Sequence, residues 1–327
     1  MSKAILFLPL CVSVLSTLTA QAQYQLRNGD FEQWETVRYR SSKQCEEPVG
    51  WSSFYDATGM HKSAGTGTVP QIYKDTQTRP GSKGKYSCRI TSREVIASVV
   101  AQGNLTTGCV NMGSLRAADA SGNYNYINDK RDDQAMRFTG HPDAVRFWVR
   151  FSGVKTAACR VFLTTKGYYQ DPAYKARNKA TLVAEALSGS RIVSNDRWTQ
   201  YTVPFAWQGT VKEPCYALVN VSTCAEPGAG NAADYLYIDD IEMIYNSEAT
   251  AVMYDGHNIL GEKEHSGSFK HEKMGKISTN GRAARASWKY DDAAQQLVVT
   301  VEGENISEDA HNKHVYCIPF KRAAKTN

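Results

Sequence analysis

Apolar and polar residues alternate along most of the chain, in short segments separated by turn-forming residues. The segments at 144–151 (AVRFWVRF), 159–165 (CRVFLTT), 198–205 (WTQYTVPF) and 215–222 (CYALVNVS) show this pattern. Alternation with a period of two predicts β-strands with one buried face, and many short strands with Gly, Pro, Asn and Asp between them predict an antiparallel sandwich. Long helical periodicity is nearly absent. The sequence therefore predicts an all-β fold, specifically a jelly-roll β-sandwich.

The segment at 233–246 (ADYLYIDDIEMIYN) breaks this alternation once. Apolar positions before Asp239 have one parity, and those after Asp240 have the opposite parity. Side chains alternate faces along a strand, so a shift by one residue predicts a β-bulge at this point. Two adjacent carboxylates in an apolar strand are costly to bury unless they are paired, hydrogen-bonded or metal-bound.

Two long polar segments, 116–136 and 166–179, interrupt the strand pattern. Loops of this length in a compact sandwich are usually functional or mobile. Both segments carry tyrosines that we expect to be exposed: Tyr124, Tyr126, Tyr168, Tyr169 and Tyr174.

The chain begins with the pattern of a secretory signal peptide. A charged start at Lys3 precedes an apolar run at 4–18 and the small-x-small signal Ala20-Gln21-Ala22. We therefore expect export to the periplasm, the cell surface or the medium, with a mature chain that begins near Gln23. The apolar run is too short for a membrane span and no later stretch approaches the required length, so no transmembrane segment is expected.

The residue pattern changes after Tyr245. Residues 246–250 look like a short linker, and the chain beyond them supplies further strands and a hairpin signal at Asp255-Gly256. The remaining length is enough for a small β-domain. The predicted organisation is a signal peptide at 1–22, a jelly-roll carbohydrate-binding domain at 23–247, and a small C-terminal β-sandwich-like domain at 248–327.

The charge and the cysteine content of the chain limit the binding partners and the redox environment that we expect. The formal net charge of +5 is small for 327 residues and basic residues form no stripe, so nucleic acid is not an expected partner. Of eight cysteines, Cys11 lies in the apolar run, which leaves an odd number in the mature chain. Export permits disulfides, but spacing does not reveal the pairing. Cys215 and Cys224 are the closest pair and could staple a hairpin.

Several pieces of the large domain occur in the same order as in a known family. These are LRNGDFEQWE (26–35), EPVGW (47–51), GNLTTGCVN (103–111), TGHPDAVRFWVRF (139–151), VFLTTKG (161–167), RWTQYTVPF (197–205) and YLYIDDIEMIYN (235–246). Over roughly residues 24–247 the chain resembles the family called "putative carbohydrate metabolism domain", which comprises exported proteins of gut Bacteroidetes. The resemblance implies a jelly roll like the galactose-binding-like carbohydrate-binding modules, and a role in glycan use. The cysteines and the insert at 116–136 depart from the family pattern.

The resemblance also implies a metal site. Galactose-binding-like modules begin near an NGDFE and end in a DD(I/V) strand, and carboxylates from these two strands often hold a structural calcium ion. Carried over by position, the implied ligands are Asp30, Glu32, Asp239 and Asp240. Calcium takes six to eight oxygen ligands, and a bulge frees backbone carbonyls. Alternatively, one aspartate faces solvent while the other accepts backbone N–H bonds at the bulge.

Sugar rings stack on aromatic faces while polar side chains bind their hydroxyls. Trp51 follows a predicted loop, Trp207 lies just past a strand, and Arg150 shares a strand face with Trp148. The candidate carbohydrate ligands are Trp51, Trp148, Arg150, Tyr168, Tyr169 and Trp207. For Trp148 a core position is the alternative, and for Arg150 a solvated strand face.

Enzyme motifs are mostly missing. There is no G-x-S-x-G elbow, HEKMG at 271–275 lacks the second histidine of a zinc motif, and GAGNAA at 228–233 leads into a strand, whereas a dinucleotide fingerprint opens a helix. Glycoside hydrolysis needs two opposed carboxylates, and the spacing selects no pair. The first interpretation is an exported, non-catalytic protein for glycan binding or glycan utilisation. The alternatives are a glycoside hydrolase or lyase with carboxylates in an inter-domain cleft, and a structural or adhesive surface protein.

Overall fold

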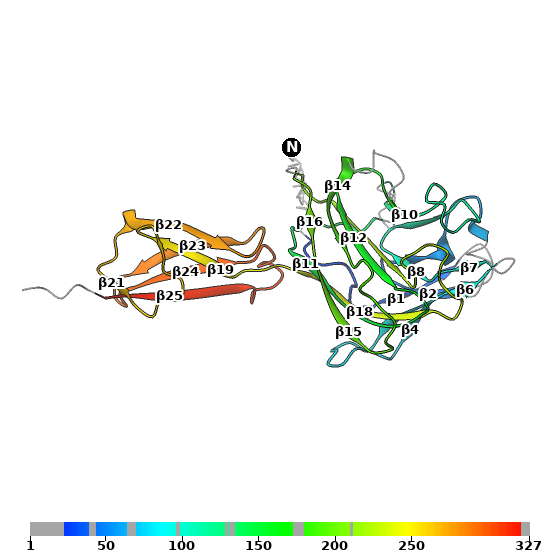
Figure 1. The fold of residues 1–327 in the computed structure, drawn as a ribbon, viewed down its shortest axis with the longest axis horizontal. Coiled ribbons are helices and arrows are strands. Elements are labelled where there is room, and N and C mark those ends of the chain that lie inside the picture. The colour runs from blue at the N-terminus through cyan, green and yellow to red at the C-terminus, as the bar shows by residue number, and fades with distance from the viewer. Residues whose placement is uncertain are drawn as a thin grey trace, which may run out of the picture.

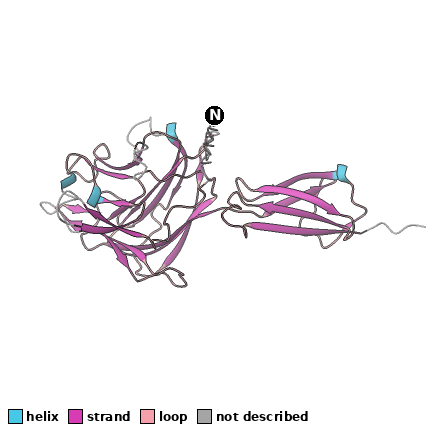
Figure 2. Ribbon diagram, turned by 180° about the vertical axis from the view of Figure 1, so that it is seen from behind, coloured by secondary structure: helices cyan, strands magenta, loops and turns pink. Residues whose placement is uncertain are grey.

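The fold is seen in a computed structural model, which describes residues 23–38, 44–63, 70–95, 99–127, 130, 135–172, 180–209 and 212–321. The predicted signal peptide and Tyr174 lie outside these residues, so export stays a prediction. Strands dominate both bodies of the molecule (Figure 2). This confirms the predicted all-β class. No helix in the described residues is long and apolar enough to cross a membrane.

The larger body is a sandwich of two antiparallel sheets (Figure 1). The five-stranded sheet has the order β15 (Thr199–Pro204), β11 (Ala144–Ser152), β18 (Tyr235–Ile244), β5 (Ser87–Thr91) and β4 (Ile72–Asp75). The six-stranded sheet has the order β16 (Ala206–Trp207), β14 (Leu182–Leu187), β12 (Ala158–Thr164), β17 (Tyr216–Ser222), β8 (Asn104–Thr106) and β3 (Ser52–Ser53). The chain crosses repeatedly between the two sheets, as expected of a jelly roll.

The alternating pattern decides which residues fill the core between the sheets. In β11, Phe147 and Phe151 are buried, whereas Trp148 and Arg150 are only partly buried and lie on the outer face. Leu163 of β12 faces the same core from the other sheet. Burial of such apolar side chains is the main stabilising term of a sandwich, at about 1.5–3 kcal/mol for each large side chain.

The two ends of the larger body lie side by side. The amide of Ile241 donates to the carbonyl of Gly29 at 2.8 Å. The Gln25 side chain accepts from the Met243 amide at 2.8 Å and donates to the Met243 carbonyl at 2.7 Å. The predicted bulge is also present, because Asp240 has a φ of 47° and the β11–β18 register shifts there.

The two polar inserts meet in one small sheet, which we call the insert sheet. It consists of β9 (Cys109–Met112), β10 (Asn123–Ile127) and β13 (Tyr169–Asp171). Ile127 and Tyr169 pack with Phe162 of the six-stranded sheet, so the insert sheet lies on the outer face of that sheet. Two hairpins complete this body: β1 (Trp34–Arg38) with β2 (Gln44–Pro48), and β6 (Arg93–Glu94) with β7 (Val100–Ala101).

The C-terminal body has a core of its own, which includes Val252, Leu297, Val299 and Phe320. One sheet contains β20 (His257–Asn258), β19 (Ala249–Tyr254) and β22 (Met274–Thr279). The other contains β21 (His265–Ser266), β25 (Lys313–Lys321), β24 (Gln296–Glu302) and β23 (Arg285–Asp291). In the described part of the chain, no strand of this body joins a sheet of the larger one.

The possible disulfide between Cys215 and Cys224 is not formed. Both cysteines are free thiols. They flank β17, which has seven residues and therefore spans about 23 Å. A disulfide needs Cα atoms within about 7 Å of each other, so the extended strand keeps the two thiols apart.

Candidate functional site

The insert sheet carries a row of three half-buried tyrosines, Tyr124, Tyr126 and Tyr168, which we call the tyrosine row. The ring centroids of Tyr124 and Tyr126 lie 5.7 Å apart, and those of Tyr126 and Tyr168 lie 5.8 Å apart. The Tyr168 hydroxyl donates to Oε1 of Gln170 at 2.9 Å, and the Tyr126 hydroxyl lies 3.2 Å from Oγ1 of Thr58. Fixed rings of this kind suit stacking against a sugar.

A cavity of about 130 Å³ adjoins this row, and Tyr124 is part of its lining. Its walls are largely apolar and include Val99, Val110, Met112 and Leu115. Its polar lining includes residues of the six-stranded sheet and of the insert sheet, among them Asn104, Asn125, Arg160, Asp171 and Ser222. An apolar cavity with a few convergent polar groups is the usual form of a small-ligand site.

The buried polar floor centres on Arg160 and Asp171. Nη2 of Arg160 lies 2.9 Å from Oδ2 of Asp171, and Nδ2 of Asn220 donates to the same oxygen at 2.6 Å. Burial raises the pKa of Asp171, and the Arg160 guanidinium opposes that shift. Nε of Arg160 is buried and has no hydrogen-bond partner among the residues that the structure describes. The floor is therefore held together by the contacts of Arg160 and Asn220 with Asp171.

The sequence analysis missed Arg160, Asp171 and Asn220. A signal existed, because Arg160 and Asn220 are polar residues within apolar strands, at positions that face away from the core. Among the described lining residues, Asp171 is the only carboxylate. Glycoside hydrolysis uses two opposed carboxylates.

A second group of carboxylates lies near the β1–β2 hairpin. Burial raises the pKa of Glu47 well above its usual range, and the charge of Asp56 adds to this shift, while the Ser53 hydroxyl donates to Glu47 and lowers the pKa. Two interacting carboxylates can mark a catalytic site. Glu47 is 3% exposed, and neither Glu47 nor Asp56 is among the described residues that line the cavity.

Two of the predicted sugar-stacking residues are core residues. Trp51 is 4% exposed, packs on Phe31 at 5.2 Å between ring centroids, and donates its indole N–H to the Asn28 carbonyl at 3.3 Å. Tyr169 is 3% exposed and packs on Phe162. Neither ring presents a face to a ligand in this conformation. Of the predicted six, only Tyr168 belongs to the tyrosine row.

Trp148 and Arg150 lie together on the opposite side of the sandwich, on the outer face of the five-stranded sheet. The Arg79 guanidinium covers the Trp148 ring at 5.3 Å from its centroid. Arg150 pairs with Asp196 at 2.9 Å. These two residues are therefore close to each other and separated from Tyr168 by the thickness of the sandwich.

Trp207 lies where the two bodies touch. His141 stacks on its ring at 5.3 Å between centroids, and the Arg282 guanidinium lies 4.3 Å from the ring centroid. The indole N–H donates to the Pro142 carbonyl at 3.3 Å. Trp207 thus contributes to the contact between the bodies, and its ring is covered by protein groups.

His141 links the same two bodies through carboxylates. Nδ1 lies 2.8 Å from Oε1 of Glu304 in the C-terminal body, and Nε2 lies 3.1 Å from Oε2 of Glu213 in the larger body. The hydrogen bond to Glu304 raises the pKa of His141. An open cleft beside this contact is lined by His141, Glu304 and the side chains of Arg282 and Arg285.

We expect the His141 contact to stabilise the protein at low pH. A histidine whose pKa is raised by folding stabilises below its unfolded pKa of about 6.5, and this contribution is lost as pH rises through the folded pKa. His141→Ala should therefore cost about 1 kcal/mol at pH 5.5 and less at pH 8.5, as measured by urea denaturation. His311→Ala, at an exposed position, is the control. An equal loss at both pH values would contradict a charged contact.

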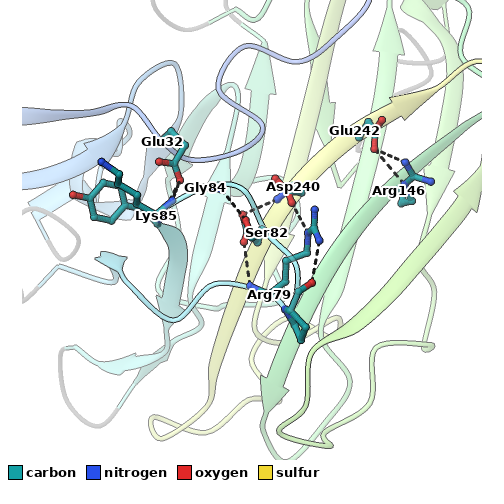
Figure 3. Close-up of polar contacts among 11 residues, drawn as sticks. Glu32, Arg79, Ser82, Gly84, Lys85, Arg146, Asp240 and Glu242 are labelled. Atoms are coloured by element: carbon teal, nitrogen blue, oxygen red, sulfur yellow. Dashed lines mark hydrogen bonds and ion pairs between the residues drawn. The ribbon is translucent and has the colours of Figure 1, made fainter. Parts of the chain in front are cut away.

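The implied calcium ligands of the first segment are Asp30 and Glu32, and Glu32 already has protein partners. Oε1 of Glu32 accepts from the amides of Lys85 and Tyr86, each at 2.8 Å (Figure 3). Asp30 is exposed. No group of three or more His, Cys, Asp or Glu side chains in the described residues could hold a metal ion. The four carboxylates do not fit a calcium site in this arrangement, and calcium binding stays a prediction.

The aspartates at the bulge have protein partners. Oδ2 of Asp240 pairs with Nε of Arg79 (Figure 3). Asp239 is fully buried, and it accepts from the amides of Asp240 at 2.9 Å and Arg79 at 3.3 Å. Burial first, and then the charge of Asp240, raise the pKa of Asp239 to about 7. This is the geometry of the alternative interpretation, in which one aspartate accepts backbone N–H bonds.

Comparisons with known proteins assign no family to the chain. No protein-family model and no curated protein matches the sequence. A solved structure from Bacteroides thetaiotaomicron, described as a "putative glycoside hydrolase", shares 15% identity with a TM-score of 0.49, over 70% of this chain and 73% of that one.

Two further solved structures are carbohydrate-binding modules. One, from work on promiscuous modules of the β-sandwich superfamily, has 11% identity and a TM-score of 0.30, over 60% of this chain and 57% of that one. The other, described as "CBM4 structure and function", has 13% identity and a TM-score of 0.28, over 66% of this chain and 96% of that one. These values do not establish a shared ligand, and the resemblance to the Bacteroidetes family stays a prediction.

Proposed function

We propose that the protein is an exported, non-catalytic accessory protein that binds a glycan at the tyrosine row and the adjoining cavity. The observation that carries the proposal is the junction of the two at Tyr124, which belongs to the row and lines the cavity. A glycan chain would lie along the rings, and one of its residues would enter the cavity.

The chemistry of both parts suits a sugar. Aromatic rings stack on the apolar C–H faces of sugar rings, which the tyrosine row provides. Sugar hydroxyls need directed donors and acceptors, which the asparagines and the Arg160–Asp171 pair of the floor provide. Nδ2 of Asn104 donates to Oδ1 of Asn125, and Nδ2 of Asn125 donates to Oδ1 of Asn104, each at 3.0 Å. This part of the floor is therefore pre-organised before a ligand arrives.

Removal of a ring from the row should weaken binding. For Tyr126→Ala or Tyr168→Ala we expect a loss of about 1 kcal/mol each, or roughly a fivefold rise in Kd, because each removes one stacking surface. A panel of soluble polysaccharides in affinity gels would first identify a retained glycan, and calorimetry would then give the Kd values. The glycan used must be neutral, so that the charge of the ligand does not contribute to its binding.

Tyr86→Ala is the matched control, because Tyr86 lies on the other side of the sandwich beneath Lys74. Its Kd should equal that of the parent protein. If the glycan retains both Tyr126→Ala and Tyr168→Ala as strongly as the parent protein, the tyrosine row does not bind the glycan. Release of reducing sugar from the retained glycan would favour the alternative of a glycoside hydrolase.

A further inference from the structure

The outer face of the five-stranded sheet carries a row in which tyrosine and arginine alternate. Tyr73 of β4 is paired with Arg89 of β5, Arg89 with Tyr237 of β18, and Tyr237 with Arg150 of β11. We call these four residues the Arg–Tyr row. Adjacent strands are about 4.8 Å apart, so the row runs about 14 Å across the sheet.

The guanidinium groups of the row lie against the tyrosine rings. Arg150 is 5.4 Å from the ring centroid of Tyr237, and Arg89 is 4.8 Å from that of Tyr73. Arg93 lies 5.8 Å from the same Tyr73 centroid and donates Nη2 to its hydroxyl at 2.8 Å. A guanidinium held on a ring in this way keeps N–H donors at its edge, where they can bind a carboxylate or a sulfate.

The charges on this face do not balance. Arg79 pairs with Asp240, Arg146 with Glu242 and Arg150 with Asp196. By contrast, Arg89 and Arg93 form no ion pair with any described residue, and Nε of each is buried without a hydrogen-bond partner.

Two further acidic residues, Asp75 in β4 and Asp239 in β18, form no ion pair with Arg89 or Arg93 in the described part of the chain. Asp75, two residues after Tyr73 in β4, accepts from the Gln77 amide at 3.0 Å. Asp239 is fully buried at the bulge. Two positive charges therefore remain uncompensated at one end of the row, where an anion would find donors that are already held in place.

We propose that the Arg–Tyr row, extended by Arg93, is a second binding site that takes an acidic polysaccharide. The ligand's carboxylate or sulfate groups bind Arg89 and Arg93, and its sugar rings lie over the aromatic side chains next to Tyr237. Those are Trp198 and Tyr235, whose ring centroids lie 6.2 Å and 5.9 Å from that of Tyr237. This site is additional to the one proposed at the insert sheet.

An acidic polysaccharide fits this face better than other polyanions do. Binding to an anionic membrane needs exposed apolar side chains beside the charges, and none of the exposed large hydrophobic residues in the described chain belongs to this face. Nucleic-acid binding relies on a dense basic stripe, and the net charge of +5 is small for this length. Arginines interleaved with aromatic rings match a chain that combines charged groups with sugar rings.

The test measures retention of the protein in affinity gels that contain polygalacturonate (carboxylate groups), chondroitin sulfate (carboxylate and sulfate groups) or dextran (neutral). Variants change the side-chain charge, the side-chain geometry or the site that is substituted. We expect the protein to be retained by at least one acidic polymer, with retention that falls between 50 and 500 mM NaCl. Arg89→Gln/Arg93→Gln should weaken this binding at least about tenfold. Arg89→Lys/Arg93→Lys should weaken it less, because the charge stays and only the planar fork is lost.

Three controls accompany the test, and the last two separate this site from the first. Lys289→Gln removes an exposed charge on the C-terminal body and should leave retention unchanged. Tyr126→Ala should leave acidic-polymer binding unchanged, and Arg89→Gln/Arg93→Gln should leave neutral-glycan binding unchanged. Thermal melting of each variant establishes that it is folded.

Three results would overturn the proposal. The first is the absence of retention by either acidic polymer. The second is retention that survives Arg89→Gln/Arg93→Gln in a folded variant. The third is binding to double-stranded DNA or to phosphatidylserine vesicles as strong as binding to the acidic polymers, which would show an unspecific attraction to polyanions.

Discussion

Replacement of Asp171 by alanine is expected to lower the free energy of unfolding by about 3 kcal/mol, because it removes one partner of a buried ion pair. Asp171 is 5% exposed and accepts from Arg160 at 2.9 Å and from Asn220 at 2.6 Å. Without it, the Arg160 charge and the Asn220 amide lose their acceptor in a place that water reaches poorly. Urea denaturation of the variant and the parent measures the loss.

Two companion variants separate charge from hydrogen bonding. Asp171→Asn keeps an acceptor for Asn220 but removes the charge, so its loss should be smaller. The double variant Arg160→Gln/Asp171→Asn should recover part of the stability, since no charge is then left unpaired. Glu226→Gln, at an exposed position near the cavity, should change stability by less than about 0.5 kcal/mol. A loss below 1 kcal/mol in Asp171→Ala would show that the floor is solvated.

The floor links stability with the proposed function. Arg160 comes from the sandwich and Asp171 from the insert sheet, so their ion pair fastens the tyrosine row to the body beneath it. A row held in this way keeps its rings in register for a ligand. Asp171→Asn should therefore affect glycan affinity through the position of the insert sheet even where the variant remains folded.

Local patterns in the sequence predicted much of the fold. The alternation in 144–151 correctly predicted the buried and exposed faces of β11, and the parity shift correctly predicted the bulge at Asp240. Asp255-Gly256 forms the predicted tight hairpin turn, with φ of 48° and 79° and with Tyr254 paired to His257. These features depend on a few neighbouring residues, which is why the sequence reveals them.

The candidate site was harder to predict, because it depends on which sheets and inserts pack on one another. Local sequence patterns do not reveal that packing. Tyr169 was expected in an exposed loop, but the insert that carries it pairs with the other insert, and its ring is then buried on Phe162. Arg160 and Asp171 belong to different sheets. Trp51 follows Gly50, whose φ of 83° turns the chain, and the ring is buried against Phe31.

Replacement of Asp239 by asparagine is expected to remove a pH dependence of stability worth about 4 kcal/mol. The pKa of Asp239 is about 7 in the folded protein, against about 3.9 for an unfolded aspartate. Between these values the folded state holds a proton that the unfolded state has released, so stability falls as pH rises from 4 to 7. Each unit of pKa difference corresponds to about 1.4 kcal/mol.

The asparagine side chain resembles the protonated aspartate, so the variant should match the parent near pH 4 and exceed its stability at pH 8. Urea denaturation at pH 4.5, 6 and 8 measures the difference, and Asp30→Asn, at an exposed position, is the control. A difference between parent and Asp239→Asn that stays constant over this range would refute the raised pKa. If calcium raised the stability of the parent but not of Asp239→Asn, the aspartate would be acting as a metal ligand. That result would favour the calcium site implied by the resemblance over the backbone-bonded arrangement. The calcium effect should then increase with pH, because a carboxylate must release its proton before it binds the ion.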